Sequence, residues 1–549
     1  MPVINFNYND LMSLVGRDMS ASEVLSVIPM MGADLHEYDE ASGETSIEFF
    51  PNRADLYSVE GLARALRAFL DIAPGLKEYP ITDSGISMRV DPSVAGVRPF
   101  VVASVVKDLD FTDEGIRSLM ELQEKLHVTV GRKRSKVAIG VHDMDQVTPP
   151  FAYRAASPES ISFVPLAKEE RMNMREILTK HEKGKDYAHL LAGKDLYPII
   201  TDAKGEVLSF PPIINGALTA VTENTKNIFI DVTGTDQTAV RGALNIITTS
   251  LAERGGAIQS VSLKGSCEMI TPDLRPSQWT LDPAQVNKAL GLKLSPEEIC
   301  QCLRRLGHGA EAGKHIKVRS PAVRMDLLHN ADLVEDVAIG YGYGNFGHTV
   351  PKAMTIGSEL PEMRLADQVR QLMVGYSFYE VQTLTLSSMK EQFDGLRRPR
   401  GAAVEVLNPV SEDTDCLRVS LLPSLLAVLR KGKHRELPQR IFECGDVVID
   451  GKRRKHLAFV AIHPKASFTE CKSLAEGVMR ELGVKISIAP SQSRTYLAGR
   501  GAEIVMEQMT VGEFGELHPE IINAYELMAP VIAFEVRLDL FAQGRRGIV

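Results

Sequence analysis

One acidic stretch organises the chain: Arg324-Met-Asp-Leu-Leu-His-Asn-Ala-Asp-Leu-Val-Glu-Asp-Val-Ala-Ile-Gly-Tyr-Gly-Tyr343. The spacing predicts a helix that begins at Ala331, with Asn330 as its N-cap. Four carboxylates lie in or beside that helix: Asp326, Asp332, Glu335 and Asp336. The three inside the helix share an arc of roughly 100°, and Asp326 is close enough in sequence to fold back toward them. Oxygen ligands gathered in this way suit Mg²⁺.

The same acids also fit a plainer interpretation, a solvated helix face. The helix dipole favours negative charge near a helix N-terminus without any metal. Against this, Ile339 lies among the acids, which indicates a face covered by another protein surface. The pattern alone leaves both interpretations open.

The composition is ordinary for a globular protein with several cores. The chain has 549 residues, and a prior of about 150 residues per domain predicts three or four domains. Hydrophobic residues make up 44% of the chain and charged residues 24%, which are typical values. The net charge is −9, so any contact with nucleic acid is expected to be local.

The cysteines and the apolar runs predict a compartment. Six cysteines are scattered without a Cys-x-x-Cys pair, which favours reduced thiols over a disulfide framework or a zinc site. The sequence shows no signal-peptide pattern. No apolar run approaches a length of about 18 residues, which a membrane span requires. We therefore expect a cytoplasmic protein that does not engage a membrane.

The element pattern predicts an α+β multidomain chain. An N-terminal α/β domain is expected over residues 1–85, and a second unit rich in β-branched residues over 86–265. A winged-helix-like module with two short helices and a strand is expected over 268–346, ending in the acidic stretch. The last unit, over 358–549, is larger and alternates helices with strands.

Polar residues in the second unit indicate either a pocket or a turn. A strand over 228–230 is expected to deliver Asp231 and Thr233 into a glycine turn, and Ser209 and Asn215 flank a Pro-Pro segment nearby. Hydroxyls and carboxylates at a strand end can orient a water molecule or a ligand hydroxyl. An ordinary turn stabilised by Asp and Thr side chains requires the same residues. A helix over 237–253 closes the unit.

Three other functional patterns are weak. A metal hydrolase would have to use the set His142, Asp143, His181 and His189, whose spacing matches no known zinc signature. A DNA-reading winged helix is disfavoured because its recognition helix would carry a mixed set of charges: Glu297, Glu298, Arg304 and Arg305. Arg53 and Asp55, in a turn after a strand, are most simply an ion pair that pins the turn.

Taken together, the motifs resemble the β subunits of phenylalanyl-tRNA synthetases of the archaeal and eukaryotic type. The resemblance covers nearly the whole chain and rests on ordered motifs besides the acidic stretch: Pro51-Asn-Arg-Ala-Asp-Leu-Tyr, Val137-Ala-Ile-Gly-Val-His-Asp, Phe210-Pro-Pro-Ile-Ile-Asn, Asp231-Val-Thr-Gly-Thr-Asp, Asn408-Pro-Val-Ser, Arg418-Val-Ser-Leu-Leu-Pro, Ile441-Phe-Glu-Cys-Gly-Asp and Gly515-Glu-Leu-His-Pro-Glu. No single motif is decisive, but their order is specific.

The resemblance implies a partner subunit and different roles for the two subunits. In the family, this chain pairs with an α subunit that uses ATP to attach phenylalanine to tRNA(Phe), and two α and two β chains assemble. The last unit is expected to be an antiparallel-sheet domain like that of class II synthetases without its active site. Consistent with that, the sequence near Gly515 lacks a Gly-x-Gly-x-Gly run followed by an acid and the ATP-binding arginine, so no ATP chemistry is assigned to this chain.

The resemblance also implies two sites. The first is Mg²⁺ bound by the acidic set Asp326, Asp332, Glu335 and Asp336 beside the α subunit. The second is proofreading in the second unit, where wrongly formed Tyr-tRNA(Phe) is hydrolysed by a site that contains Ser209, Asn215, Asp231 and Thr233. Proofreading is needed because a hydrophobic pocket rejects an isostere with one extra hydroxyl by only about a hundredfold. A stand-alone deacylase of mischarged tRNA is the alternative.

Overall fold

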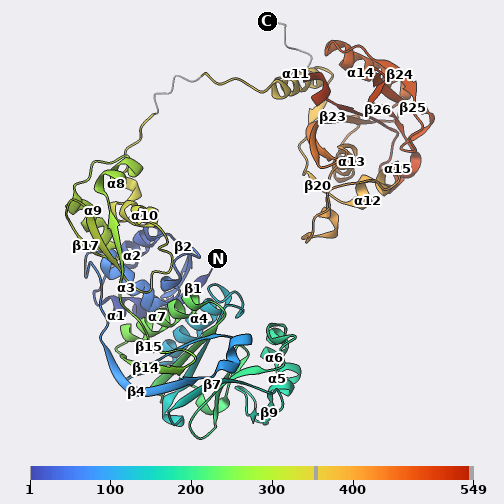
Figure 1. The fold of residues 1–549 in the computed structure, drawn as a ribbon. Helices are drawn as coiled ribbons and strands as arrows, with labels where there is room; N and C mark the ends of the chain where they lie inside the picture. Colours follow the sequence, from blue (N-terminus) through green and yellow to red (C-terminus); the bar gives the residue numbers. More distant parts are fainter. Residues whose placement is uncertain (1, 351–355, 543–549) are drawn as a thin grey trace. The chain divides into compact units, whose positions relative to one another are not determined.

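The computed structural model describes residues 2–350 and 356–542, and the chain divides into two compact units, Met1–Thr349 and Val350–Val549. Both units mix helices and sheets (Figure 1), so the expected α+β multidomain class is confirmed. The finer boundaries near residues 85 and 265 stay predictions. In the described ranges, no helix is long and apolar enough to cross a membrane.

The first unit begins with a small sheet covered by helices. Its strand order is β1-β3-β2, and the elements are β1 (Val3–Asn7), α1 (Tyr8–Val15), α2 (Ala21–Val27), β2 (Ala33–Tyr38), β3 (Glu44–Phe49) and α3 (Val59–Phe69). Between β3 and α3, Arg53 donates two hydrogen bonds to Asp55, at 2.8 and 2.9 Å. The predicted ion pair in this turn is therefore confirmed.

A ten-stranded sheet forms the centre of the first unit. Its order is β12-β11-β10-β7-β4-β14-β5-β13-β6, with β15 paired to β14. The strands are β4 (Ile81–Val90), β5 (Phe100–Lys107), β6 (Val137–Asp143), β7 (Phe151–Ala156), β10 (Tyr197–Thr201), β11 (Val207–Phe210), β12 (Ile214–Asn215), β13 (Ile228–Gly234), β14 (Ala257–Gly265) and β15 (Met269–Thr271). Helices α4 (Asp113–Val128) and α7 (Gln237–Glu253) share a buried core with one face of this sheet.

Side-chain alternation along β13 decides which residues can form a site. Ile228, Ile230 and Val232 pack into the core shared with α4 and α7. Successive strand residues point to opposite faces, so Asp231 and Thr233 face away from these helices. The sequence placed these two residues in a turn, which was wrong. The strand continues to Gly234 because β5 and β6 pair with it along its whole length.

The acidic stretch lies in a small module of the first unit. The module contains β16 (Ser277–Leu281), α8 (Pro283–Leu290), α9 (Pro296–Arg305), β17 (Gly309–Glu311), β18 (Ile316–Ser320) and α10 (Asn330–Tyr341). The N-cap of α10 is His329 and not the predicted Asn330. His329 accepts from the amide of Ala331, and the carboxylate of Asp332 accepts from the His329 amide, which together form a capping box.

The second unit is built on a seven-stranded sheet with the order β19-β22-β23-β27-β26-β25-β24. Its strands are β19 (Tyr379–Glu380), β22 (Gln439–Ile449), β23 (Lys452–Ile462), β24 (Ser487–Pro490), β25 (Tyr496–Met506), β26 (Met509–Leu517) and β27 (Val531–Arg537). The main helices are α11 (Pro361–Gly375), α13 (Leu422–Lys431) and α14 (Phe468–Glu481). The sheet is antiparallel apart from the β19–β22 pair.

Candidate functional site

The four residues predicted for the second site come together. One cavity of about 140 Å³ is lined by Ser209, Asn215, Asp231 and Thr233. Ser209 lies on β11 and Asn215 on β12, whereas the other two lie on β13. The strands that carry them are far apart in the sheet order, so the cavity forms where the segment after β11 folds toward β13 and β6. Asn215 contributes to this closure by donating to the carbonyl of Val141, at 3.4 Å.

Asp231 is the centre of a buried hydrogen-bond network. Its Oδ1 lies 2.7 Å from Nε2 of His142 and accepts from the hydroxyl of Ser209 at 3.2 Å. The other ring nitrogen of His142 lies 2.8 Å from the hydroxyl of Thr219. Because a carboxylate can only accept, Nε2 carries a proton toward Asp231. The carboxylate is thereby held in one orientation beside the cavity.

Gly140 makes room for this network. It lies directly opposite Asp231 in the β13–β6 ladder. A Cβ atom at this position would lie 2.4 Å from Oδ1 of Asp231 and 2.6 Å from Nε2 of His142. These distances are far below van der Waals contact, so the register of two strands leaves room for no side chain at this position. Sequence reasoning missed Gly140 and assigned His142 only to a weak metal hypothesis.

Thr233 is held by a buried arginine that the sequence did not identify. The guanidinium of Arg98 donates to the Thr233 hydroxyl at 2.9 Å and to its carbonyl at 2.8 Å. Burial lowers the pKa of Arg98 to about 10, which still leaves it charged at neutral pH. The positive charge lies on the same strand face as Asp231 and contributes favourably to that carboxylate. No short-range sequence signal connects these residues, which lie 135 positions apart.

A basic segment provides another wall of the cavity. Arg134 lines the cavity, donates to the carbonyl of Ile213 at 2.9 Å and packs over the ring of Tyr187. Its Nε is buried without a hydrogen-bond partner among the described residues. Arg134 and the two residues before it, Arg132 and Lys133, all have positive φ angles. Three such residues in a row are rare for non-glycine residues, and strained backbone of this kind is concentrated at functional sites.

The acidic set predicted to bind Mg²⁺ is arranged differently. Arg324 lies between two of its members: its Nη2 is 2.7 Å from Asp326 and 2.8 Å from Asp336. Asp336 also lies 2.7 Å from Nε2 of His308, on the loop after α9. Burial and the nearby Arg324 both lower the pKa of His308. These two carboxylates are therefore paired with one cation of the same chain, Arg324, and not only with water.

The remaining members of the acidic set have other roles or no described contact. Asp332 accepts from the amides of Leu328 and His329, both at 2.7 Å, and so caps α10. Glu335 is exposed. Ile339 packs against the core of its own unit, so a partner surface is not needed to explain its place among the acids. The four carboxylates do not form a ready-made Mg²⁺ site in this chain, and Mg²⁺ binding stays a prediction.

One other group of possible metal ligands occurs in the described ranges. Asp34, His36 and Glu48 bring their ligand atoms within 4.8 Å of one another on β2 and β3. Two of them are exposed, and exposed acids commonly gather without an ion. No described group of three ligands includes the members of the weak metal-hydrolase pattern, namely His142, Asp143, His181 and His189.

Family models match three parts of the chain. Residues 347–538 match the phenylalanyl tRNA synthetase beta chain CLM domain, residues 279–343 the tRNA synthetase B5 domain, and residues 113–256 the B3/4 domain. The cavity residues belong to the third match and the acidic stretch to the second.

Similar proteins span the whole length. The phenylalanine–tRNA ligase beta subunit of Methanothrix thermoacetophila is 46% identical over 543 residues, with 98% of this chain and 100% of the relative covered. That of Methanosarcina barkeri is 47% identical over 549 residues, with 99% and 100% covered. The crystal structure of an N-terminal fragment of the phenylalanyl-tRNA synthetase beta subunit from Pyrococcus horikoshii is 38% identical, with a TM-score of 0.60 over 62% of this chain and 99% of that fragment.

Proposed function

The chain belongs to the family of phenylalanine–tRNA ligase β subunits, and we propose that it supports an α subunit in joining phenylalanine to tRNA(Phe) and hydrolyses mischarged Tyr-tRNA(Phe). The observation that carries the second activity is the convergence of Ser209, Asn215, Asp231 and Thr233 on one cavity. The first activity takes place on the α subunit, so this chain contributes binding and assembly.

The size and the lining of the cavity suit a tyrosyl group. An apolar cavity of about 150 Å³ holds one benzene molecule, and this cavity measures about 140 Å³. Apolar walls come from Ile139, Phe210 and Ile213, while Asp231 supplies a polar group at one side. An aromatic ring with one hydroxyl therefore matches both the volume and the chemistry.

Asp231 gives a physical basis for rejecting phenylalanine. A buried carboxylate accepts a hydrogen bond from the phenol hydroxyl of tyrosine, whereas a phenyl ring leaves it without that donor. Sites built to bind a substrate hydroxyl discriminate against the analogue without it by roughly 10⁴–10⁵. His142 and Ser209 act as positioning residues because they contact Asp231 and fix its orientation.

Hydrolysis requires water at the ester carbon. The water oxygen forms a bond to the carbonyl carbon, the ester bond to the tRNA breaks, and the ribose hydroxyl leaves with a proton. In this proposal, the guanidinium of Arg134, which lines the cavity, stabilises negative charge on the carbonyl oxygen or on the last phosphates of the tRNA. In this scheme, most of the rate acceleration comes from holding the ester and the water molecule in the correct relative positions.

The Asp231→Asn variant tests proofreading. We expect hydrolysis of Tyr-tRNA(Phe) to fall by at least about a hundredfold, because the amide donates where the carboxylate accepts. Formation of Phe-tRNA(Phe) with the α subunit should remain unchanged. The matched control is Asp143→Asn, which replaces another buried aspartate on the neighbouring strand, outside the cavity lining. Undiminished hydrolysis in Asp231→Asn would remove this residue from the site.

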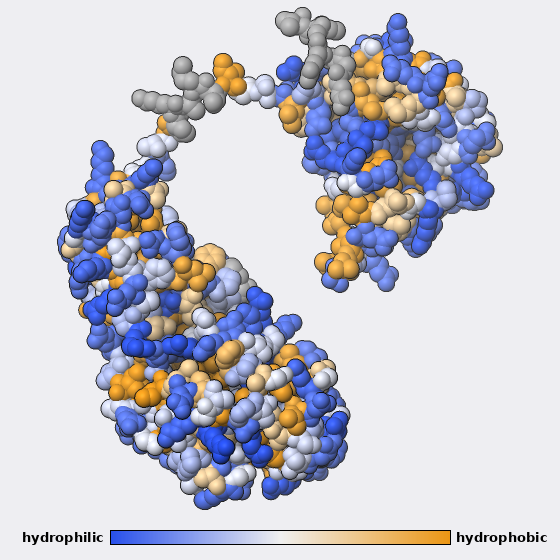
Figure 2. Space-filling model, viewed as in Figure 1, coloured by the Kyte–Doolittle hydropathy of each residue, from blue (hydrophilic) through white to orange (hydrophobic). Residues whose placement is uncertain are grey.

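Exposed apolar residues in the second unit support a partner surface. Leu407 is 93% exposed and Val410 is 103% exposed, and both lie in the loop before β21 (Cys416–Leu417). Figure 2 shows a hydrophobic projection of this unit near β20 (Leu386–Ser387). Apolar side chains this exposed indicate a protein interface. The names of the relatives imply an α subunit as the partner.

The Leu407→Asp, Val410→Asp double variant tests this interface. We expect it to lose co-purification with the α subunit and hence phenylalanylation, while Tyr-tRNA(Phe) hydrolysis persists. The control is Met509→Asp with Met528→Asp, two exposed apolar positions elsewhere in the same unit. If the unaltered chain hydrolyses Tyr-tRNA(Phe) and binds no α subunit, the stand-alone deacylase is favoured instead.

A further inference from the structure

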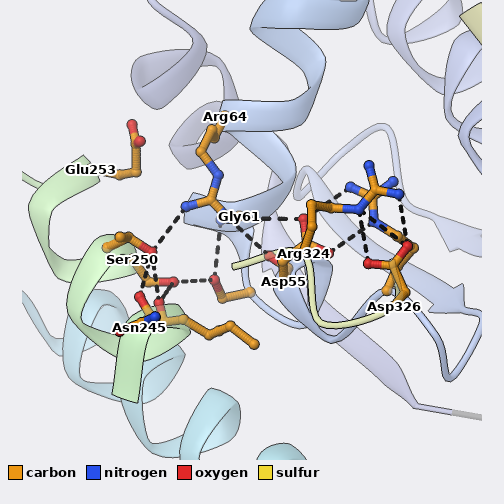
Figure 3. A network of polar contacts seen from close by, with 12 residues as sticks. Asp55, Gly61, Arg64, Asn245, Ser250, Glu253, Arg324 and Asp326 are labelled. Atoms are coloured by element: carbon orange, nitrogen blue, oxygen red, sulfur yellow. Dashed lines mark hydrogen bonds and ion pairs between the residues drawn. The ribbon is translucent and has the colours of Figure 1, made fainter. Parts of the chain in front are cut away.

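A second and larger cavity of the first unit has no part in the proposed proofreading. It measures about 1320 Å³ and is bordered by α3, the segment before β4, Arg241 and Thr249 of α7, the segment after β15 and residues 321–324. Figure 3 shows part of its wall, where Arg64, Asp55 and Arg324 come together. Regions far apart in sequence therefore contribute charged side chains to one hollow.

The deep wall of this cavity is electrically balanced. Arg53 is held by Asp55, and Arg324 is held by Asp326. Arg64 is the least firmly paired of these cations: it lies 4.0 Å from Asp55 and makes side-chain hydrogen bonds of 3.2 and 3.4 Å. Its side chain is only 12% exposed. Arg64 thus offers donors to a stronger acceptor than its present partners.

The sides of the cavity carry excess positive charge at two places. Glu253, on α7, is shared by two cations, Arg67 and Lys77. Asp273 is likewise shared by Arg241 and Arg275, each at 2.7 Å. All four cations line the cavity. One carboxylate cannot neutralise two cations, so each place contributes about one net positive charge toward the same hollow.

An apolar wall lies beside these charges. Ile270 is 67% exposed and Ile81 is 37% exposed, and both line the cavity together with Leu274. An exposed isoleucine at a cavity mouth gains from contact with a flat apolar group. Glu78, which pairs with Arg319, and Asp83 also line the cavity. The cavity therefore combines two places where cations outnumber carboxylates with a hydrophobic surface.

We propose that this cavity binds the phosphate of a nucleotide, with the base against the apolar wall at Ile270. A phosphate monoester carries about two negative charges at neutral pH, which matches the two uncompensated cations. Arginine forks are well suited to phosphate oxygens. A free nucleotide supplies this monoester, whereas a nucleotide in an RNA strand supplies a diester that has one negative charge and offers the same kind of oxygen acceptors to arginine. The experiment distinguishes these two sources.

Equilibrium dialysis of the full chain against labelled AMP, adenosine and single-stranded oligoadenylate tests the site. We expect the Lys77→Gln, Arg241→Gln double variant to bind the phosphate-bearing probe at least about tenfold more weakly than the unaltered chain. Both side chains are nearly half exposed, at 46% and 43%, so neither is needed for the core. Adenosine should bind far more weakly than AMP.

A matched control removes the same charge elsewhere. Arg175→Gln with Lys226→Gln replaces two exposed cations, each in a one-to-one ion pair outside the cavity. Ile270→Glu is a second variant, which adds a negative charge at an exposed position and should also abolish binding.

AMP binding that is lost in both cavity variants and kept in the control supports a free nucleotide as the ligand. Oligoadenylate binding with the same dependence, but no AMP binding, supports an RNA strand. Equal affinities in the cavity variants and the control, or no binding of either phosphate-bearing probe to the unaltered chain, overturns the proposal.

Discussion

Arg324→Met tests whether the acidic stretch is held together by an arginine. Methionine keeps an unbranched aliphatic side chain, which is shorter than that of arginine, and removes the charge. Arg324 is 3% exposed at its side chain and lies within 2.8 Å of both Asp326 and Asp336. Removal of one partner from a buried ion pair costs about 3–5 kcal/mol, because it leaves an uncompensated buried charge. We therefore expect the free energy of unfolding to fall by at least about 3 kcal/mol at pH 8.

The loss of unfolding free energy in Arg324→Met should be smaller at low pH, because His308 can then carry a proton. Burial and Arg324 both lower the pKa of this histidine, whereas Asp336 beside it raises it. Without Arg324 the pKa of His308 in the folded state is higher than in the unaltered chain. The folded variant then binds a proton that helps to neutralise Asp336. This stabilisation is present at low pH and is lost as the pH rises through that pKa, so destabilisation is greater at pH 8 than at pH 6.

The assay uses the single tryptophan of the chain. Trp279 lies on β16 and packs beside the core that includes Leu333 and Val337 of α10. Its fluorescence during urea unfolding therefore reports on the module that carries Arg324. The control is Arg319→Met, which breaks an ion pair that is 49% exposed on the arginine side and should cost less than about 1 kcal/mol. A loss this small in Arg324→Met as well would refute the reasoning.

The same variant tests the predicted Mg²⁺ site. When Arg324 is absent, Asp326 and Asp336 are free to bind a divalent ion, so Mg²⁺ should restore part of the lost stability. A ligand that binds only the folded state stabilises it in proportion to the logarithm of its concentration. Stabilisation of the unaltered chain by Mg²⁺ to the same extent would show that the metal does not compete with Arg324.

Two further outcomes follow from the geometry. Gly140→Ala should reduce Tyr-tRNA(Phe) hydrolysis by at least about tenfold with little change in phenylalanylation, because the added Cβ would collide with Asp231. Hydrolysis at the unaltered rate would show that the close approach of Gly140 to Asp231 is not needed for this activity. Burial raises the pKa of Asp55, but the Arg53 guanidinium more than offsets this effect, so the pKa of Asp55 is lowered to about 2. The ionised carboxylate should therefore contribute about 2 kcal/mol to the free energy of unfolding above pH 3.8, and this contribution should be lost as the pH falls toward 2. Acid unfolding of Asp55→Asn, followed by circular dichroism, should lack this component, and an unchanged acid transition would contradict the assignment.

Local sequence signals predicted many elements correctly. The helix over 237–253 has the predicted bounds, and the Ser-x-x-Glu pattern of Ser295 and Glu298 forms a capping box on α9. Gly291 ends α8 with a positive φ, as expected for a glycine C-cap. These features depend on residues a few positions apart, which is why periodicity and capping patterns could identify them.

Features that depend on distant contacts were missed. Helical spacing placed three acids on one arc of α10, but it could not reveal that Arg324 lies between Asp336 and Asp326. The segment 379–386 alternates like a strand, yet only Tyr379 and Glu380 pair with β22. Residues 381–385 belong to no strand, Leu384 is 74% exposed, and Leu386 begins β20, which pairs with β21 in a separate sheet. Apolar alternation shows that a segment can pair, whereas the available neighbouring strand decides whether it does.

The location of Asp231 on a central strand has a consequence for how the specificity of this cavity can change. β13 is paired on both edges, by β5 and β6, so its backbone cannot shift to accommodate a different ligand. Loops can change through insertions and deletions, but the strand that carries the Asp231 carboxylate cannot, because it is paired on both edges. A new ligand preference would have to arise by exchanging side chains at fixed points, and position 140 is the most restrictive of these. Variation among related cavities should therefore be found in residue identity and not in chain length.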